Sequence, residues 1–162
     1  MLLEDDALAR AIGVALIARG ATVAVAETTA GGLIAARLLS VAGASAWFER
    51  GVVCYSAKAK RDLTGVDPAF LKTHGAVSRE SVLALAEGLR RIAGVEYAVA
   101  ESGIAGPPGA RRSPKPVGSV VIAVVTPEGS FVEEHVFPGS RAQVMEAIAE
   151  RVLAMLLDLL PL

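Results

Sequence analysis

The sequence predicts an α/β protein in which helices cover both faces of a mixed β-sheet. Short apolar strands alternate with amphipathic helices along the chain, and this order is typical of a three-layer α/β/α sandwich. Two strands joined by a tight turn follow near the end and add antiparallel pairing to the sheet. The 162 residues carry no repeat and no linker, so we expect a single domain over residues 1–162.

The chain begins with a helix and a strand. Apolar residues at helical spacing predict a helix over residues 5–19, which Asp5 or Asp6 can cap and which Gly20 ends. Residues 22–27 form a short apolar run that ends in a polar residue. Such a run between turn signals indicates a buried strand.

The next elements repeat this order. Two glycines open a helix over residues 31–39, and an apolar run predicts a strand over residues 50–55. Ser56 can cap a short helix after that strand. Residues 67–74 predict one or two further helical turns.

The second half of the chain supplies the longest helices and the hairpin. Ser78 caps an amphipathic helix that ends at a glycine, and residues 97–100 form a buried strand. Residues 118–126 and 130–137 predict a β-hairpin, because Pro-Glu-Gly separates them. A capping box that begins at Ser140 opens the last helix.

Composition excludes several classes of protein. Lys and Arg number 16 against 17 Asp and Glu, for a formal net charge of -1, so we expect no nucleic-acid partner. One cysteine, Cys54, excludes an intrachain disulfide and a cysteine-based zinc site. No signal peptide begins the chain and no apolar stretch is long enough for a membrane span. We therefore expect a cytoplasmic protein with no membrane partner.

In an open α/β sheet the site lies outside the carboxyl ends of the strands. Three segments qualify, at residues 27–32, 55–60 and 102–117. In the first, free amides at the start of a helix attract a phosphate or carboxylate, although an ordinary cap and turn fits the same residues. The glycines of the third segment let backbone approach a ligand, although a rigid crossover explains them equally well.

Ser45, Tyr55, Ser56, Lys58 and Lys60 are the candidate chemical groups. The two histidines show no triad pattern, so a hydrolase here would need a serine and a neutral lysine. Lys60 lies one turn into the helix that Ser56 caps, where burial and the helix dipole favour a neutral amine. The alternative is that both lysines lie on the surface and that Ser45 is a helix cap. No metal and no cofactor is implied.

Several segments together resemble the C-terminal domain of the CinA competence/damage-inducible family. They are Ala-Glu-Thr-Thr-Ala-Gly-Gly at 26–32, Gly-Ala-Ser-Ala-Trp-Phe-Glu-Arg-Gly at 43–51, Tyr-Ser at 55–56, Ala-Lys at 59–60, His-Gly-Ala-Val-Ser at 74–78, Ser-Gly-Ile-Ala-Gly-Pro at 102–107 and Lys-Pro-Val-Gly at 115–118. They keep the family's order and cover nearly the whole chain. The length leaves no room for the N-terminal domain of larger members, so we expect the stand-alone form.

The resemblance implies a three-layer α/β domain, frequent homo-oligomers and a nicotinamide-nucleotide amidohydrolase. That reaction converts nicotinamide mononucleotide and water to nicotinate mononucleotide and ammonia without a metal, so a pyridine nucleotide is the expected small-molecule partner. The family's serine–lysine pair matches Ser45 and Lys60, with Tyr55 beside them. Substrate contacts are implied for Thr28, Gly31, Gly32, Ser102, Gly103, Gly106 and Arg141, and Thr28 and Ser56 remain alternative nucleophiles.

The chain departs from the family at three places. In the third segment Arg111 and Arg112 stand where more glycine is usual. The first loop usually reads Glu-Ser-Cys-Thr-Gly-Gly, whereas Thr28, Thr29 and Ala30 stand at its centre here. Glu101 precedes Ser102 where a small or apolar residue is usual, and it can hold a cationic group or repel a phosphate. Two other functions therefore stay open. One is a nucleotide-binding domain without catalysis, and the other is a partner-binding module linked to competence or DNA damage.

Overall fold

The computed structural model describes residues 4–107, 109 and 113–161. Six α-helices, one short 3₁₀-helix and five strands are assigned in these residues. In chain order they are α1 (Ala7–Arg19), β1 (Val23–Glu27), α2 (Leu33–Leu39), η1 (Ala44–Ala46), β2 (Phe48–Val53), α3 (Ala57–Thr64), α4 (Pro68–His74), α5 (Arg79–Ala93), β3 (Tyr97–Gly103), β4 (Ser119–Thr126), β5 (Gly129–Val136) and α6 (Arg141–Asp158).

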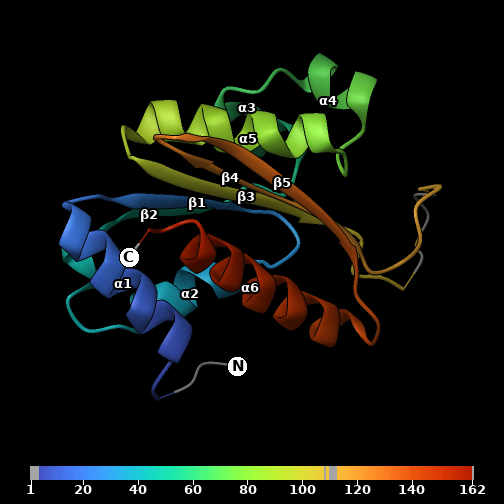
Figure 1. Ribbon diagram of the computed structural model, residues 1–162. Helices are drawn as coiled ribbons and strands as arrows, with labels where there is room; N and C mark the ends of the chain where they lie inside the picture. The colour runs from blue at the N-terminus through green and yellow to red at the C-terminus, as the bar shows by residue number, and fades with distance from the viewer. Residues whose placement is uncertain (1–3, 108, 110–112, 162) are drawn as a thin grey trace.

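The five strands form one mixed sheet in the order β2-β1-β3-β4-β5. β1 pairs parallel with both β2 and β3, whereas β4 pairs antiparallel with β3 and β5. Figure 1 shows α1, α2 and α6 on one face of the sheet and α3, α4 and α5 on the other. The predicted three-layer α/β/α sandwich with a mixed sheet is therefore confirmed.

Each face of the sheet has its own apolar core. Alternate residues of β1 and β3 contribute to the two cores, so that Val25 and Val99 face α1, α2 and α6 while Ala26 and Ala100 face α5. Every residue of β1 is buried, as expected for a central strand covered on both faces. Over the residues that the structure describes, none of the helices has both the length and the apolar character needed to cross a membrane.

The helix caps follow the sequence closely. Asp6 is the N-cap of α1, and its carboxylate accepts a hydrogen bond from the amide of Ala9. Ser56 and Ser78 cap α3 and α5, and both bonds of the predicted capping box are formed at Ser140. Each cap satisfies an amide that has no partner inside the helix. Capping residues in the sequence thus fix where these helices begin.

Several strand boundaries differ from the predicted ones, and those of β2 and β3 differ most. β2 begins and ends two residues earlier than predicted, at Phe48 and Val53. Phe48 pairs with Val23 across a register shift that leaves Glu49 as an extra residue in β2. β3 continues to Gly103, because β4 pairs with it as far as that residue. Ser102 and Gly103 therefore lie in a strand and not in the loop where the sequence places them.

A buried ion pair links the helices of one layer. The Arg37 guanidinium on α2 contacts both carboxylate oxygens of Asp6, at 2.6 and 3.1 Å, and a carboxylate oxygen of Glu150 on α6 at 2.6 Å. The Arg37 hydrogen bond holds the pKa of Asp6 below its usual value. This contact joins the start of α1 to α2 and α6.

Candidate active site

The carboxyl ends of the three parallel strands meet at one edge of the sheet, at the right of Figure 1. In the register Glu27 lies beside Val53, and Ala26 lies beside Ala100. The segments after β1, β2 and β3 therefore leave the sheet side by side, as the sequence predicts. α6 begins at the same side of the molecule (Figure 1).

The side chain of Glu27, the last residue of β1, lies at the start of α2. Its carboxylate is fully buried and accepts hydrogen bonds from the amides of Gly32 at 3.1 Å, Ile34 at 2.9 Å and Ala35 at 2.9 Å. Burial raises its pKa, and these three bonds act against that rise. A carboxylate of the chain therefore occupies the amide of Gly32, and substrate contact at Gly32 stays a prediction.

Thr29 and Gly103 join the first and third segments. The Thr29 hydroxyl donates to the carbonyl oxygen of Gly103 at 3.0 Å and accepts from the amide of Gly103 at 2.7 Å. The amide of Gly103 is therefore also occupied within the chain. Thr29 acts here as a structural link between the ends of β1 and β3.

Glu101 lies on β3 and has no exposed surface. Its Oε1 atom accepts hydrogen bonds from the amides of Thr28 at 2.6 Å and Ala30 at 2.9 Å. Its Oε2 atom is buried and has no hydrogen-bond partner among the described residues. Desolvation by burial raises its pKa to about 7, with the nearby Glu27 carboxylate adding to the rise.

Lys60 and the hydroxyl of Thr28 both lie near Cys54. The lysine is on α3 and only 4% exposed, and its charge acts on the buried thiol of Cys54. The Thr28 hydroxyl is 3.4 Å from the carbonyl oxygen of Cys54. Burial raises the pKa of that thiol overall, which makes Cys54 a poor nucleophile. Lys60 and Thr28 are therefore brought to one place by the ends of β1 and β2.

Ser45 lies at the other end of β2. It is an exposed residue of η1, which precedes the strand, whereas Lys60 follows the strand on α3. A strand of six residues separates its own ends by about 16 Å, at about 3.3 Å per residue. The structure therefore does not bring Ser45 and Lys60 together within one chain.

Tyr55 and Ser56 lie between β2 and α3. The Tyr55 side chain is 67% exposed, so its ring extends into solvent beyond the strand. The Ser56 hydroxyl accepts a hydrogen bond from the amide of Ala59 at 3.0 Å. Ser56 therefore acts as a helix cap, which weakens its case as an alternative nucleophile.

The remaining predicted contacts lie around the third segment. Ser102 is buried on β3, one residue after Glu101. Arg141, the first residue of α6, donates from its guanidinium to the carbonyl oxygen of Gly106 at 3.0 Å. A guanidinium has five N–H groups, so this bond leaves others for an anion. Gly31 is exposed at the turn before α2.

Sequence reasoning missed what the two buried glutamates do. Glu27 was expected only as part of a loop motif, and no role was decided for Glu101. A polar residue at the end of an otherwise apolar strand was the available signal, because such a residue needs hydrogen-bonding partners once buried. Within the described residues, no group of three or more His, Cys, Asp or Glu side chains is placed to hold a metal ion.

Comparisons with known proteins agree with this fold over nearly its whole length. The model of the CinA C-terminal domain family matches residues 5–160. The chain is similar to the competence damage-inducible protein A of Klebsiella pneumoniae, with a TM-score of 0.90, 34% identity and 94% of each chain covered. It is also similar to the competence/damage inducible protein of Agrobacterium tumefaciens, with a TM-score of 0.88, 39% identity and coverage of 93% of this chain and 92% of that one.

Two curated relatives differ in length. A CinA-like protein of Syntrophobacter fumaroxidans is 44% identical over 94% of this chain, which spans only 36% of that relative. The nicotinamide-nucleotide amidohydrolase of Escherichia coli K12 is 46% identical over 85% of this chain and 83% of its own length. A family match that includes both the strand-end segments and the helices around them identifies the chain as a member of the CinA C-terminal domain family.

Proposed function

We propose that the chain is an amidohydrolase that converts nicotinamide mononucleotide to nicotinate mononucleotide and ammonia. The observation that carries this proposal is a buried lysine, Lys60, whose charge acts on Cys54 at the strand ends, where the Thr28 hydroxyl also contacts Cys54. Burial generally disfavours the ammonium form of a lysine, and a general base must be neutral. The similarity to the Escherichia coli amidohydrolase over most of both chains supplies the substrate class.

In the proposed mechanism Lys60 takes the proton of a serine hydroxyl as the serine oxygen attacks the carboxamide carbon. The protonated Lys60 then returns the proton to the departing nitrogen, and ammonia leaves with formation of an acyl-enzyme. Water, deprotonated by Lys60, hydrolyses the ester and releases the carboxylate product. Tyr55 holds the amine or donates to the leaving group, and Arg141 binds the phosphate.

The serine of this mechanism is Ser45 of a second copy of the chain. β2 is an edge strand of the sheet, and a two-fold pairing of two identical edge strands is antiparallel. Such pairing places the amino end of one β2 beside the carboxyl end of the other. If Phe48 of one copy lies opposite Val53 of the other, Ser45 reaches the level of Ser56, where α3 begins.

The character of the β2 edge supports this pairing. An acidic and a basic residue, Glu49 and Arg50, lie next to each other on the strand and pair within the chain, so this part of the edge presents no net charge that would repel a second copy. Val53 is 50% exposed and Tyr55 67% exposed at the carboxyl end. Pairing would also satisfy the backbone groups that an edge strand leaves open.

Thr28 is the alternative nucleophile that needs no second copy, because it and Lys60 both lie near Cys54 of the same chain. A second candidate function follows from the same loop. The Thr29 hydroxyl is fully engaged with Gly103, and Ala30 is buried in the core. Neither residue therefore offers a hydroxyl to substrate, which favours a domain that binds the nucleotide without hydrolysing it.

Ammonia release from nicotinamide mononucleotide by the purified protein, with a chelator present, tests the proposal. Turnover that forms nicotinate mononucleotide supports the amidohydrolase. A thermal shift with the nucleotide but no ammonia favours the binding domain, and neither response favours a partner-binding module. The test is decisive because the three functions give three different pairs of results.

The Arg141→Ala variant is expected to raise KM for nicotinamide mononucleotide by about tenfold and to change kcat little, as the loss of one charge-assisted contact predicts. Arg141→Lys keeps the charge without the two-pronged geometry and should fall between the parent and the alanine variant. Steady-state kinetics on the three proteins is the measurement. An unchanged KM in both variants would remove Arg141 from the phosphate site.

A further inference from the structure

Glu101 stands out because a fully buried carboxyl lies in the middle of the sheet. β3 is otherwise apolar from Tyr97 to Ala100, and it lies between β1 and β4. Burying a carboxyl is costly unless its oxygens accept hydrogen bonds. One oxygen, Oε2, has no such partner among the described residues, so the interaction of the other oxygen must justify the residue's presence.

That other oxygen holds the segment after β1. Oε1 accepts from the amides of Thr28 and Ala30, two residues apart, at 2.6 and 2.9 Å. All three residues of the 28–30 segment are buried, so water cannot replace these bonds. A buried amide that loses its acceptor destabilises the conformation in which it is buried. The conformation of the segment therefore depends on Glu101.

The segment carries the Thr28 hydroxyl, which lies near Cys54, as Lys60 does. The segment forms a bend after β1, in which the Thr28 hydroxyl contacts Cys54 while the Thr29 hydroxyl contacts Gly103. The Thr29 contacts fix one side chain, but only Glu101 among the described side chains binds the amides of Thr28 and Ala30. Glu101 therefore fixes the backbone from which the Thr28 hydroxyl reaches Cys54.

We propose that Glu101 is a positioning residue, which fixes the Thr28–Ala30 segment through its Oε1 atom and so holds the Thr28 hydroxyl against the Lys60 site. The reading of this segment as part of an active site rests on the proposed function. The hydrogen bonds themselves do not. A glutamine at this position retains one carbonyl oxygen of the same reach, so the proposal predicts that Glu101→Gln keeps the segment in place.

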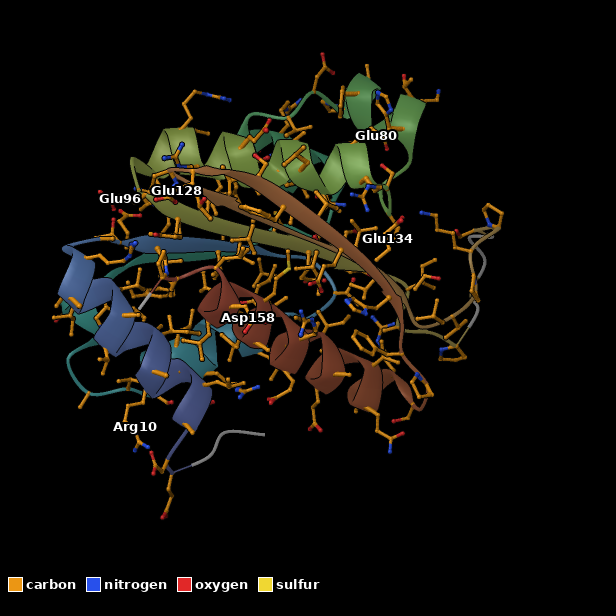
Figure 2. The ribbon with its side chains drawn as sticks, in the orientation of Figure 1. Arg10, Glu80, Glu96, Glu128, Glu134 and Asp158 are labelled. Atoms are coloured by element: carbon orange, nitrogen blue, oxygen red, sulfur yellow. The ribbon has the colours of Figure 1, made fainter. Side chains whose placement is uncertain are left out.

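Amide hydrogen exchange, followed by NMR on the unliganded protein, tests the contact without any substrate. In Glu101→Ala the amides of Thr28 and Ala30 are expected to exchange at least about tenfold faster, and in Glu101→Gln to stay within about threefold of the parent. Glu96→Ala is the matched control, since Glu96 also accepts two bonds from one residue, Thr22, at 2.7 and 2.9 Å. Figure 2 shows Glu96 at the opposite end of the sheet, where its removal should affect Thr22 alone.

Kinetics provides a second readout. Glu101→Ala is expected to raise KM for nicotinamide mononucleotide by about tenfold with kcat within about threefold of the parent, and Glu101→Gln to restore KM. If Glu101→Ala does not fold, Glu101→Asp replaces it, because a carboxyl one methylene shorter cannot reach both amides and should give the same fast exchange.

Two results would overturn the proposal. One is unchanged exchange at Thr28 and Ala30 in the alanine or aspartate variant, and the other is a glutamine variant that behaves like the alanine variant. A parent protein with no turnover would refute the proposed amidohydrolase but would leave the exchange experiment intact. Failure of the positioning role and failure of the proposed function are therefore distinguishable.

Discussion

An equal mixture of the Ser45→Ala and Lys60→Ala proteins, after subunit exchange, is expected to recover about a quarter of the parent activity. Each variant alone should lose at least about a thousandfold in kcat, because one lacks the nucleophile and the other lacks the base. In a two-fold dimer about half of the molecules become mixed, and each mixed molecule holds one site with both residues. Ammonia release from nicotinamide mononucleotide before and after exchange is the measurement.

The control for this experiment is Lys58→Ala. Lys58 lies on the same helix as Lys60, but it is exposed and pairs with Asp62 at 2.7 Å, so its loss should leave activity within about twofold of the parent. A mixture that stays inactive would contradict a site shared between copies. A Ser45→Ala protein that keeps its activity would instead indicate that Thr28 is the nucleophile. The Thr28→Val variant would then be inactive.

The sequence predicts the layers of this fold because local signals and burial agree there. Ser140 caps α6 as its capping box requires, and the apolar face that begins at Val144 packs on the sheet. Strand ends are less certain from sequence. Pairing with β4 carries β3 on to Gly103, and such pairing depends on a strand some twenty residues away in sequence.

The position of Ser45 shows what spacing along the chain does not determine. Ser45 and Lys60 are close in sequence, but a complete extended strand lies between them. An extended strand separates its ends more than any other element of equal length. Family resemblance pairs the two residues chemically, whereas the path of the chain through β2 determines that they lie at opposite ends of it.

The two buried glutamates limit the prediction in a different way. Hydrophobic patterning places apolar residues well, but it does not identify the partner of a polar residue inside an apolar run. Glu27 and Glu101 both bind backbone amides of the segments that follow β1. Those amides appear in sequence as free donors for a ligand, and only the three-dimensional structure shows that two side chains already occupy them.

Glu101 should also make the protein less stable as pH rises from about 4.5 to about 7. Its pKa is raised to about 7 in the folded protein, chiefly by burial, from a usual value of 4.5. Between these values the folded state binds more protons than the unfolded state, so the free energy of unfolding falls with increasing pH. A difference of this size corresponds to about 3 kcal/mol at most, which is reached above pH 7.

Glu101→Gln removes this titration and leaves the neighbouring groups in place. The free energy of unfolding of the glutamine variant, relative to the parent, is expected to increase by about 3 kcal/mol between pH 4.5 and pH 8. Urea unfolding of both proteins at several pH values in this range gives the difference. The Glu27 carboxylate acts on Glu101, and the Cys54 thiol responds to it. Both groups are present in both proteins, so their own contributions to the free energy of unfolding largely cancel.

Glu96 is the control for the pH experiment, because its contribution to the free energy of unfolding changes with pH in the opposite direction. Hydrogen bonds from Thr22 hold the pKa of Glu96 below its usual value, so its contribution is present at neutral pH and is lost as pH falls. If the free energies of unfolding of the parent and Glu101→Gln change in parallel with pH, Glu101 stays charged when buried, and its Oε2 atom has a hydrogen-bonding partner in solution. If the free energies of unfolding of the two proteins instead diverge as pH rises, the Thr28–Ala30 segment is held by a carboxyl that carries a proton over much of the pH range below 7. The neutral amide of Glu101→Gln imitates that protonated carboxyl.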